Sequence, residues 1–158
     1  MAQATRATKA LEQAGIRFEL RSYDYDPDAD SIGQAAASAL GVEPAQVFKT
    51  LMVLIDGKPA CAIAPSDGEV SMKRVAAALG AKSATMMRPA DAERLTGYKV
   101  GGISPFGQTK RVPVVIDETA LLWEAIFVNG GQRGLQVFLA GEDAACALEA
   151  VVADIGAA

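Results

Sequence analysis

Histidine is absent from this chain of 158 residues. Without an imidazole, the protein cannot use a Ser-His-Asp triad, a Cys-His pair or a histidine-ligated zinc ion. The two cysteines, Cys61 and Cys146, are far apart in apolar surroundings, so we expect two buried thiols rather than a disulfide or a zinc site. Most hydrolase mechanisms are therefore excluded, and we predict neither a bound metal nor a cofactor.

Long hydrophobic runs are also missing. No segment approaches the roughly 20 apolar residues that span a bilayer, and residues 1–15 lack the continuous apolar region of a secretory signal. We therefore expect a cytoplasmic protein with no membrane contact.

Positive charge is in the minority, with 15 Lys and Arg against 19 Asp and Glu, which gives a net charge of −4. A strongly basic nucleic-acid-binding protein is excluded, and any contact with nucleic acid must rest on a local patch. No basic recognition helix or helix-turn-helix pattern is present, so we expect no DNA binding.

The chain is long and apolar enough, with 51% hydrophobic residues, for one domain that spans residues 1–158. Helical and strand patterns alternate along it, which predicts an α/β or α+β fold. Capping residues such as Ser31, Gly41 and Ser71 support several boundaries. The predicted helices are 4–14, 31–40, 71–79, 89–95 and 141–155, and the predicted strands are 16–21, 47–55, 59–64, 112–116, 126–128 and 135–139.

Lys49 is out of place inside the apolar run 47–55. Alternation puts it on the same strand face as four apolar residues, Val47, Leu51, Val53 and Ile55. A buried ammonium is costly, so Lys49 either faces a cavity for an anionic or carbonyl-bearing ligand or has a depressed pKa. The alternative is a strand that starts one residue later, with a side chain that reaches water along its own methylenes.

The stretch 96–107 is too rich in glycine for a helix and too apolar for a mobile linker. Adjacent glycines allow backbone N–H groups to converge on one oxygen, although such a loop on its own is more often a structural turn. Residues 95–116 contain no acid, while Lys99, Lys110 and Arg111 lie there and Arg133 lies in a later turn. This basic edge faces either phosphate or only solvent.

Several motifs together resemble one known family. The segments are Val47-Phe48-Lys49-Thr50-Leu51, Lys73-Arg74-Val75-Ala76, and Thr96-Gly97-Tyr98 followed by Gly101-Gly102-Ile103-Ser104-Pro105-Phe106-Gly107. This chain closely resembles the YbaK family, bacterial aminoacyl-tRNA deacylases that are related to the editing domain of prolyl-tRNA synthetase. The resemblance runs almost from end to end and implies a single domain with a mixed, strongly curved, barrel-like sheet.

The resemblance also implies a function and a site. A free-standing trans-editing enzyme would remove a wrong amino acid, cysteine above all, from tRNA(Pro), with prolyl-tRNA synthetase as its partner. The family lysine matches Lys49, and the glycines that hold the ester carbonyl match Gly101 and Gly102. The expected substrate-binding residues are Tyr23, Ile32, Thr50, Ser104, Pro105 and Gln136. In the cysteine-specific branch the thiol of the substrate attacks the ester and forms a thiolactone.

Three positions depart from the family pattern. Gln136 stands where aspartate is common, Ile32 replaces an aromatic residue, and Phe48 replaces a tyrosine. These changes leave the deacylase class intact but open the alternative of a sister branch that clears alanine or another small residue. A module that binds tRNA or a synthetase without catalysis is the alternative from another class of function.

Overall fold

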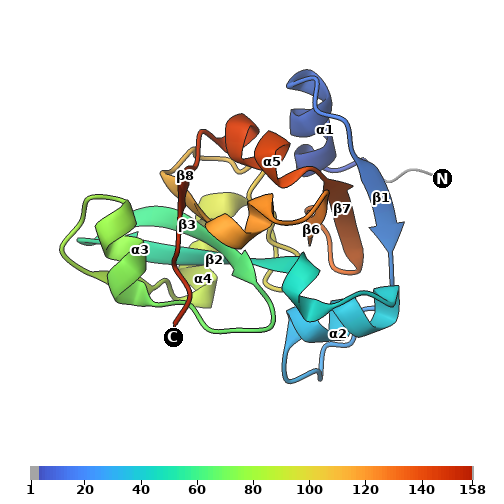
Figure 1. Ribbon diagram of the computed structural model, residues 1–158, viewed down its shortest axis with the longest axis horizontal. Helices are drawn as coiled ribbons and strands as arrows, with labels where there is room; N and C mark the ends of the chain where they lie inside the picture. The colour runs from blue at the N-terminus through green and yellow to red at the C-terminus, as the bar shows by residue number, and fades with distance from the viewer. Residues whose placement is uncertain (1–3, 158) are drawn as a thin grey trace.

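The computed structural model describes residues 4–157, and one mixed eight-stranded sheet forms its centre (Figure 1). The order across the sheet is β1-β7-β6-β2-β3-β5-β8, with β4 also beside β2. Three pairs, β2–β6, β3–β5 and β5–β8, are parallel, and the others are antiparallel. The predicted mixed α/β class is confirmed. The strands are β1 Glu19–Ser22, β2 Val47–Ile55, β3 Lys58–Pro65, β4 Ala84–Met86, β5 Val114–Asp117, β6 Ile126–Asn129, β7 Leu135–Leu139 and β8 Val151–Ala153.

Strand β2 has two different neighbours along one edge. Its opposite edge pairs with β3 from Phe48 to Ile55. On the first edge, β6 pairs only with Val47 and Phe48, and β4 pairs only with Val53 to Ile55. Residues 49–52 therefore have no strand partner on that edge, and the sheet has a gap there.

The helices lie on both sides of the strands. In Figure 1, α1 and α5 lie above the sheet and α2 lies below it. Ser31 and Ser71 cap α2 and α3 by accepting a hydrogen bond from a first-turn N–H, and Gly41 ends α2 with a φ of 71°, as predicted. The helices are α1 Arg6–Gln13, α2 Ile32–Leu40, α3 Met72–Ala78, α4 Pro89–Thr96 and α5 Gly141–Leu148, with short 3-10 helices at Pro44–Gln46 and Glu118–Leu121.

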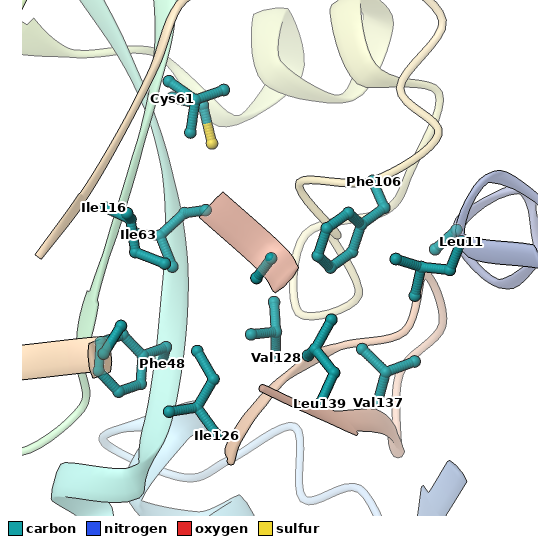
Figure 2. Packing of buried hydrophobic residues seen from close by; sticks show 14 of the residues in the cluster. Leu11, Phe48, Cys61, Ile63, Phe106, Ile116, Ile126, Val128, Val137 and Leu139 are labelled. Atoms are coloured by element: carbon teal, nitrogen blue, oxygen red, sulfur yellow. The ribbon is translucent and has the colours of Figure 1, made fainter. Parts of the chain in front are cut away.

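The largest hydrophobic cluster lies between α1, α5 and the sheet. Figure 2 shows Phe48 of β2 pointing into this cluster with Ile63 and Ile126 from neighbouring strands. A second cluster lies under α3, and a third packs α2 against Val47 and Phe127. Burial of each large side chain stabilises the fold by about 1.5–3 kcal/mol, so the two ends of β2 are firmly held on either side of the gap.

The C-terminal prediction was wrong. A helix over 141–155 was expected, but α5 ends at Leu148 because Glu149 adopts a left-handed backbone with φ 51°. The chain then turns and adds β8 to the sheet, parallel to β5. Strand β4 was not predicted at all.

Two smaller expectations also differ. Cys61 is buried as expected, and burial raises the pKa of its thiol to about 12. Cys146 is exposed on α5, because it lies on the helix face away from the core. The first strand covers 19–22 rather than 16–21, although Ile16, Phe18 and Leu20 do pack against the core.

Candidate active site

The gap beside β2 opens into a cavity of about 330 Å³. Because the cavity lies at a strand edge, side chains from both faces of β2 reach it, and Lys49, Thr50 and Met52 all line it. The remaining walls come from the start of α2, the ends of β6 and β7, the β4–α4 segment and the glycine-rich loop. A cavity of this size is at the lower end of the range for small-molecule sites.

The backbone of Thr50 also points toward the gap. The Met52 carbonyl oxygen on this edge accepts a hydrogen bond from Met87 N–H at 3.0 Å. In a β-strand, alternate residues present their N–H and C=O groups to the same edge. The N–H and C=O of Thr50 therefore face the unpaired part of the edge, where a ligand can meet them.

Lys49 lies within β2, which begins at Val47, so the alternative of a later strand start is wrong. Its side chain is half-buried, lines the cavity and donates from Nζ to the Gly68 carbonyl oxygen at 2.7 Å. None of the ion pairs in residues 4–157 includes Lys49. One N–H of the Lys49 ammonium thus binds the Gly68 carbonyl, and the other N–H donors are available to a ligand.

The start of helix α2 forms another wall. Ser31, Ile32 and Gly33 line the cavity, and Ser31 Oγ accepts the N–H of Gln34. The first N–H groups of a helix lack intrahelical acceptors and carry a partial positive charge. This wall therefore favours an electron-rich group, as Lys49 does.

Two buried polar atoms in the cavity wall have no hydrogen-bond partner among residues 4–157. They are Thr50 Oγ1 and Gln136 Oε1. Buried polar groups normally pair, because an unpaired group costs about 1–3 kcal/mol. An unpaired hydroxyl and amide in one cavity wall are explained if a ligand completes their hydrogen bonds.

Tyr23 lies behind this wall rather than in it. Burial raises the pKa of its hydroxyl, while the nearby Gln136 side chain and the Gly134 backbone act in the opposite direction. Tyr23 does not line the cavity, so its place is beside Gln136 and not against a ligand. A neutral phenol there limits how far the Gln136 side chain can move.

Gly101 is the glycine of the glycine-rich loop that lines the cavity, between the apolar residues Val100 and Ile103. Its φ of 90° is in the region that favours glycine, and a Cβ there would overlap the Tyr25 hydroxyl. Asn129 Nδ2 donates to its carbonyl oxygen at 3.3 Å, and Arg133 Nε donates to the carbonyl of Val100 at 2.9 Å. The loop is thus held in one shape by contacts from two other segments.

Gly102, Ser104 and Pro105 do not line the cavity. The Gly102 N–H donates to the Lys99 carbonyl at 2.8 Å, and a Cβ at Gly102 would lie 2.7 Å from the Arg133 backbone nitrogen. Ser104 Oγ accepts the Phe106 N–H. In this conformation these three residues shape the loop, whereas Gly101, Val100 and Ile103 are the loop residues that line the cavity.

Of the expected site residues, the structure brings five together around the cavity: Lys49, Gly101, Ile32, Thr50 and Gln136. The sequence analysis missed Asn129 and an apolar wall. Asn129 is followed by Gly130, and this Asn-Gly pair was interpreted only as a hairpin turn. The turn does connect β6 to β7. The apolar wall consists of Met52, Met86, Met87, Val100 and Ile103.

The basic edge is not one surface patch with one role. Arg133 stacks over the Tyr25 ring, with 5.4 Å between the guanidinium carbon and the ring centroid, close to the Gly101 loop. Arg111 instead pairs with Glu149 of the chain itself at 3.2 Å. Arg133 is therefore the member placed beside the cavity.

Within residues 4–157, no group of three or more acidic or cysteine side chains lies close enough to hold a metal ion. No helix in that range is both long and apolar enough to cross a membrane.

A family model of the aminoacyl-tRNA editing domain matches residues 26–146. The match covers more than half of the chain, so the protein belongs to the aminoacyl-tRNA editing domain family. This finding confirms the resemblance that the motifs indicated.

Individual proteins agree with the family. A protein of Enterococcus faecalis (strain ATCC 700802 / V583) named "Putative Cys-tRNA(Pro)/Cys-tRNA(Cys) deacylase EbsC" is 36% identical over 142 residues, which are 89% of this chain and 85% of that protein. A proline--tRNA ligase of Acidithiobacillus ferrooxidans (strain ATCC 53993 / BNL-5-31) is 33% identical over 85 residues, which are 54% of this chain but only 15% of the ligase.

Solved structures show the same fold. A structure described as "a putative trans-editing enzyme for prolyl tRNA synthetase" superimposes with a TM-score of 0.84 and 20% identity, covering 99% of this chain and 100% of that one. At this identity the likeness establishes the fold alone.

Proposed function

We propose that this protein is a free-standing deacylase that removes mischarged amino acids, cysteine above all, from tRNA(Pro). The observation that carries the proposal is the cavity in the β2 gap. It brings the Lys49 ammonium, the unpaired Thr50 hydroxyl and Gln136 amide, and the N-terminus of α2 together around one cavity. The similarity to EbsC over most of both chains supports the substrate class.

The chemistry must work without a nucleophile and base from the chain. The chain has no histidine, and no cysteine or carboxylate among residues 4–157 lines the cavity. Thr50 and Ser31 have hydroxyls there, but neither has a general base beside it. Rate enhancement then comes from holding the ester in a reactive geometry and stabilising developing negative charge.

Each cavity group has a role in this account. The carbonyl oxygen of the ester gains negative charge when it is attacked, and the Lys49 ammonium stabilises that charge or the charge on the departing ribose oxygen. Thr50 and Gln136 hold the polar atoms of the acyl group. Gly101 bounds the site where only a residue without a side chain fits.

For a cysteinyl ester, we infer that the substrate provides the nucleophile. The sulfur of its thiol attacks the ester carbonyl carbon, the C–O bond to the ribose breaks, and the thiol proton ends on the ribose oxygen. The products are a cysteine thiolactone and free tRNA. Proline has no thiol, so the chemistry itself protects the correct ester, whereas a steric sieve between small side chains would discriminate only modestly.

Recognition of the tRNA body calls for a partner. With a net charge of −4, the protein has little non-specific affinity for phosphate. We propose that it acts together with prolyl-tRNA synthetase, which holds tRNA(Pro). The similarity to a segment of a proline--tRNA ligase supports a link between this chain and that enzyme.

The test is deacylation of tRNA(Pro) charged with cysteine, serine, alanine or proline by the purified protein. Clearance of the cysteinyl ester alone is the expected result, because serine matches cysteine in size but lacks the thiol. Clearance of alanyl or seryl esters would instead indicate the sister branch, in which water is the nucleophile. If no ester is cleared above its spontaneous rate, with or without prolyl-tRNA synthetase, catalysis is contradicted and a binding module remains.

A further inference from the structure

The charges in the cavity wall are all of one sign. Lys49 is the only charged side chain among the lining residues in the described part of the chain, and no carboxylate is among them. The N-terminus of α2 adds partial positive charge. The other polar lining groups, on Ser31, Thr50, Asn129 and Gln136, are neutral.

The acids that are near in sequence face elsewhere. Glu93 Oε2 accepts the N–H of Val100 at 2.9 Å. Asp67 and Glu69 are exposed on either side of Gly68, and Asp30, which precedes Ser31, is also exposed. None of these four carboxylates lines the cavity.

This charge pattern matters for the α-amino group of an aminoacyl ester. As an ammonium it would enter a cavity with no carboxylate to pair with, next to the like charge of Lys49. The unpaired acceptors there are a hydroxyl, an amide and the Thr50 backbone carbonyl, all of them uncharged, and they bind a neutral amine or a hydroxyl as well as an ammonium. A cavity built to select an ammonium would present an acid at this point.

We propose that the cavity selects an acyl group that is uncharged at its α position, so that the protein also cleaves tRNA esters of 2-hydroxy acids that carry a thiol in place of the cysteine thiol. Aminoacyl esters enter with the amine neutral. This inference rests on the proposed deacylase function and extends its substrate class. Bond making and breaking are unchanged: the sulfur of the acyl group replaces the ribose oxygen on the carbonyl carbon, and its proton passes to that oxygen.

The experiment compares two esters of tRNA(Pro) that differ only at the α position. One carries cysteine, and the other carries 2-hydroxy-3-sulfanylpropanoate, in which a hydroxyl replaces the amine. Each rate at neutral pH is divided by the spontaneous rate of the same ester, which removes the difference in intrinsic lability. We expect the enhancement for the hydroxyacyl ester to equal or exceed that for the cysteinyl ester.

Other results overturn the inference in distinguishable ways. If the cysteinyl ester is cleared but the hydroxyacyl ester is enhanced at least tenfold less, the proposed function stands and the charge selection is wrong. If neither ester is cleared, both fail together.

A charge variant gives a second readout. Gln136→Glu places an acid in the cavity wall and should shift the ratio of the two enhancements toward the cysteinyl ester by about tenfold. Gln132→Glu, on an exposed residue of the nearby β6–β7 turn, is the matched control and should leave the ratio unchanged. An unchanged ratio in a folded Gln136→Glu protein would contradict the inference.

Discussion

The two ends of the β2 gap differ in the polarity of the side chains that line them. At the β6 end, Lys49, Thr50, Asn129 and Gln136 present polar atoms to the cavity, and Thr50 Oγ1 and Gln136 Oε1 have no partner in the described chain. At the β4 end, Met52, Met86 and Met87 present only flexible apolar side chains. The same strand edge therefore contributes to a polar surface at one end of the gap and to an apolar surface at the other.

The difference separates stability from chemistry. Unpaired buried polar groups destabilise the fold, so we expect the polar side chains at the β6 end to serve ligand binding rather than folding. Burial of methionine side chains stabilises the fold directly, and these flexible side chains can adapt to the shape of an acyl group or nucleoside. Substitutions at the β6 end should therefore lower activity more than stability, and substitutions of buried residues at the β4 end should lower stability more than activity.

Apart from substitution of Lys49, the largest effect should come from Gly101→Ala, which disturbs the loop that Asn129 holds. The new methyl group needs a φ of 90° and overlaps the Tyr25 hydroxyl, so the loop or the Tyr25 side chain must move. We expect kcat/KM for cysteinyl-tRNA(Pro) to fall about 100-fold, because a small misplacement of reacting groups is that costly. Gly57→Ala is the control: its φ of 82° imposes similar strain, but nothing lies within 4 Å and the cavity is remote. An equal loss of activity in both variants would contradict a specific role for Gly101.

Gln136→Leu tests the β6 end by removing a polar group without changing its size much. The side chain is 5% exposed and its Oε1 is unpaired. We expect kcat/KM to fall about tenfold, while the free energy of unfolding in urea stays equal or rises by up to about 1 kcal/mol. A clear loss of stability would show that Gln136 serves the fold after all.

Met87→Ala tests the β4 end and should show the reverse. Met87 is only 7% exposed, so truncation should lower the free energy of unfolding by about 2–3 kcal/mol, with kcat changed less than the KM. Denaturant unfolding and steady-state kinetics on the same preparation separate the two effects. Unchanged stability would contradict the packing role of this end.

The smallest effect is expected for Met86→Ala. This neighbouring methionine also lines the cavity but is 53% exposed, so its loss should cost less than about 0.5 kcal/mol. Denaturant unfolding of Met86→Ala and Met87→Ala under the same conditions compares the loss of unfolding free energy in the two variants, and burial of the side chain is expected to account for the difference.

The sequence predicted the parts of the fold that local chemistry determines. The β2–β3 hairpin follows from two apolar runs around Asp56-Gly57, and Ser31 and Ser71 mark their helices by capping. Lys49 could be found because a charged residue breaks an apolar strand pattern. Its neighbours Thr50 and Gly101 came from the family resemblance, and both do line the cavity.

Other features depend on contacts that are distant in sequence. Strand β4 has three residues, too few for a periodic pattern, and exists because Val53 pairs with Met86. The end of α5 depends on a left-handed Glu149, a residue that gives no helix-stop signal. Ser104 belongs to the same motif as Gly101, but a motif does not say which way a side chain points, and Ser104 lies in the loop interior.

The most direct test of the account is single-turnover deacylation of cysteinyl-tRNA(Pro) by the protein and its Lys49→Met variant. Methionine keeps the apolar stem of lysine but not the charge, and Lys58→Met, on an exposed lysine at the start of β3, is the control. We expect the rate to fall at least about 100-fold for Lys49→Met, as for loss of a main oxyanion donor, with an unchanged melting temperature and no effect of Lys58→Met. Full activity in a folded Lys49→Met protein would contradict the assignment of the β2 gap as the active site.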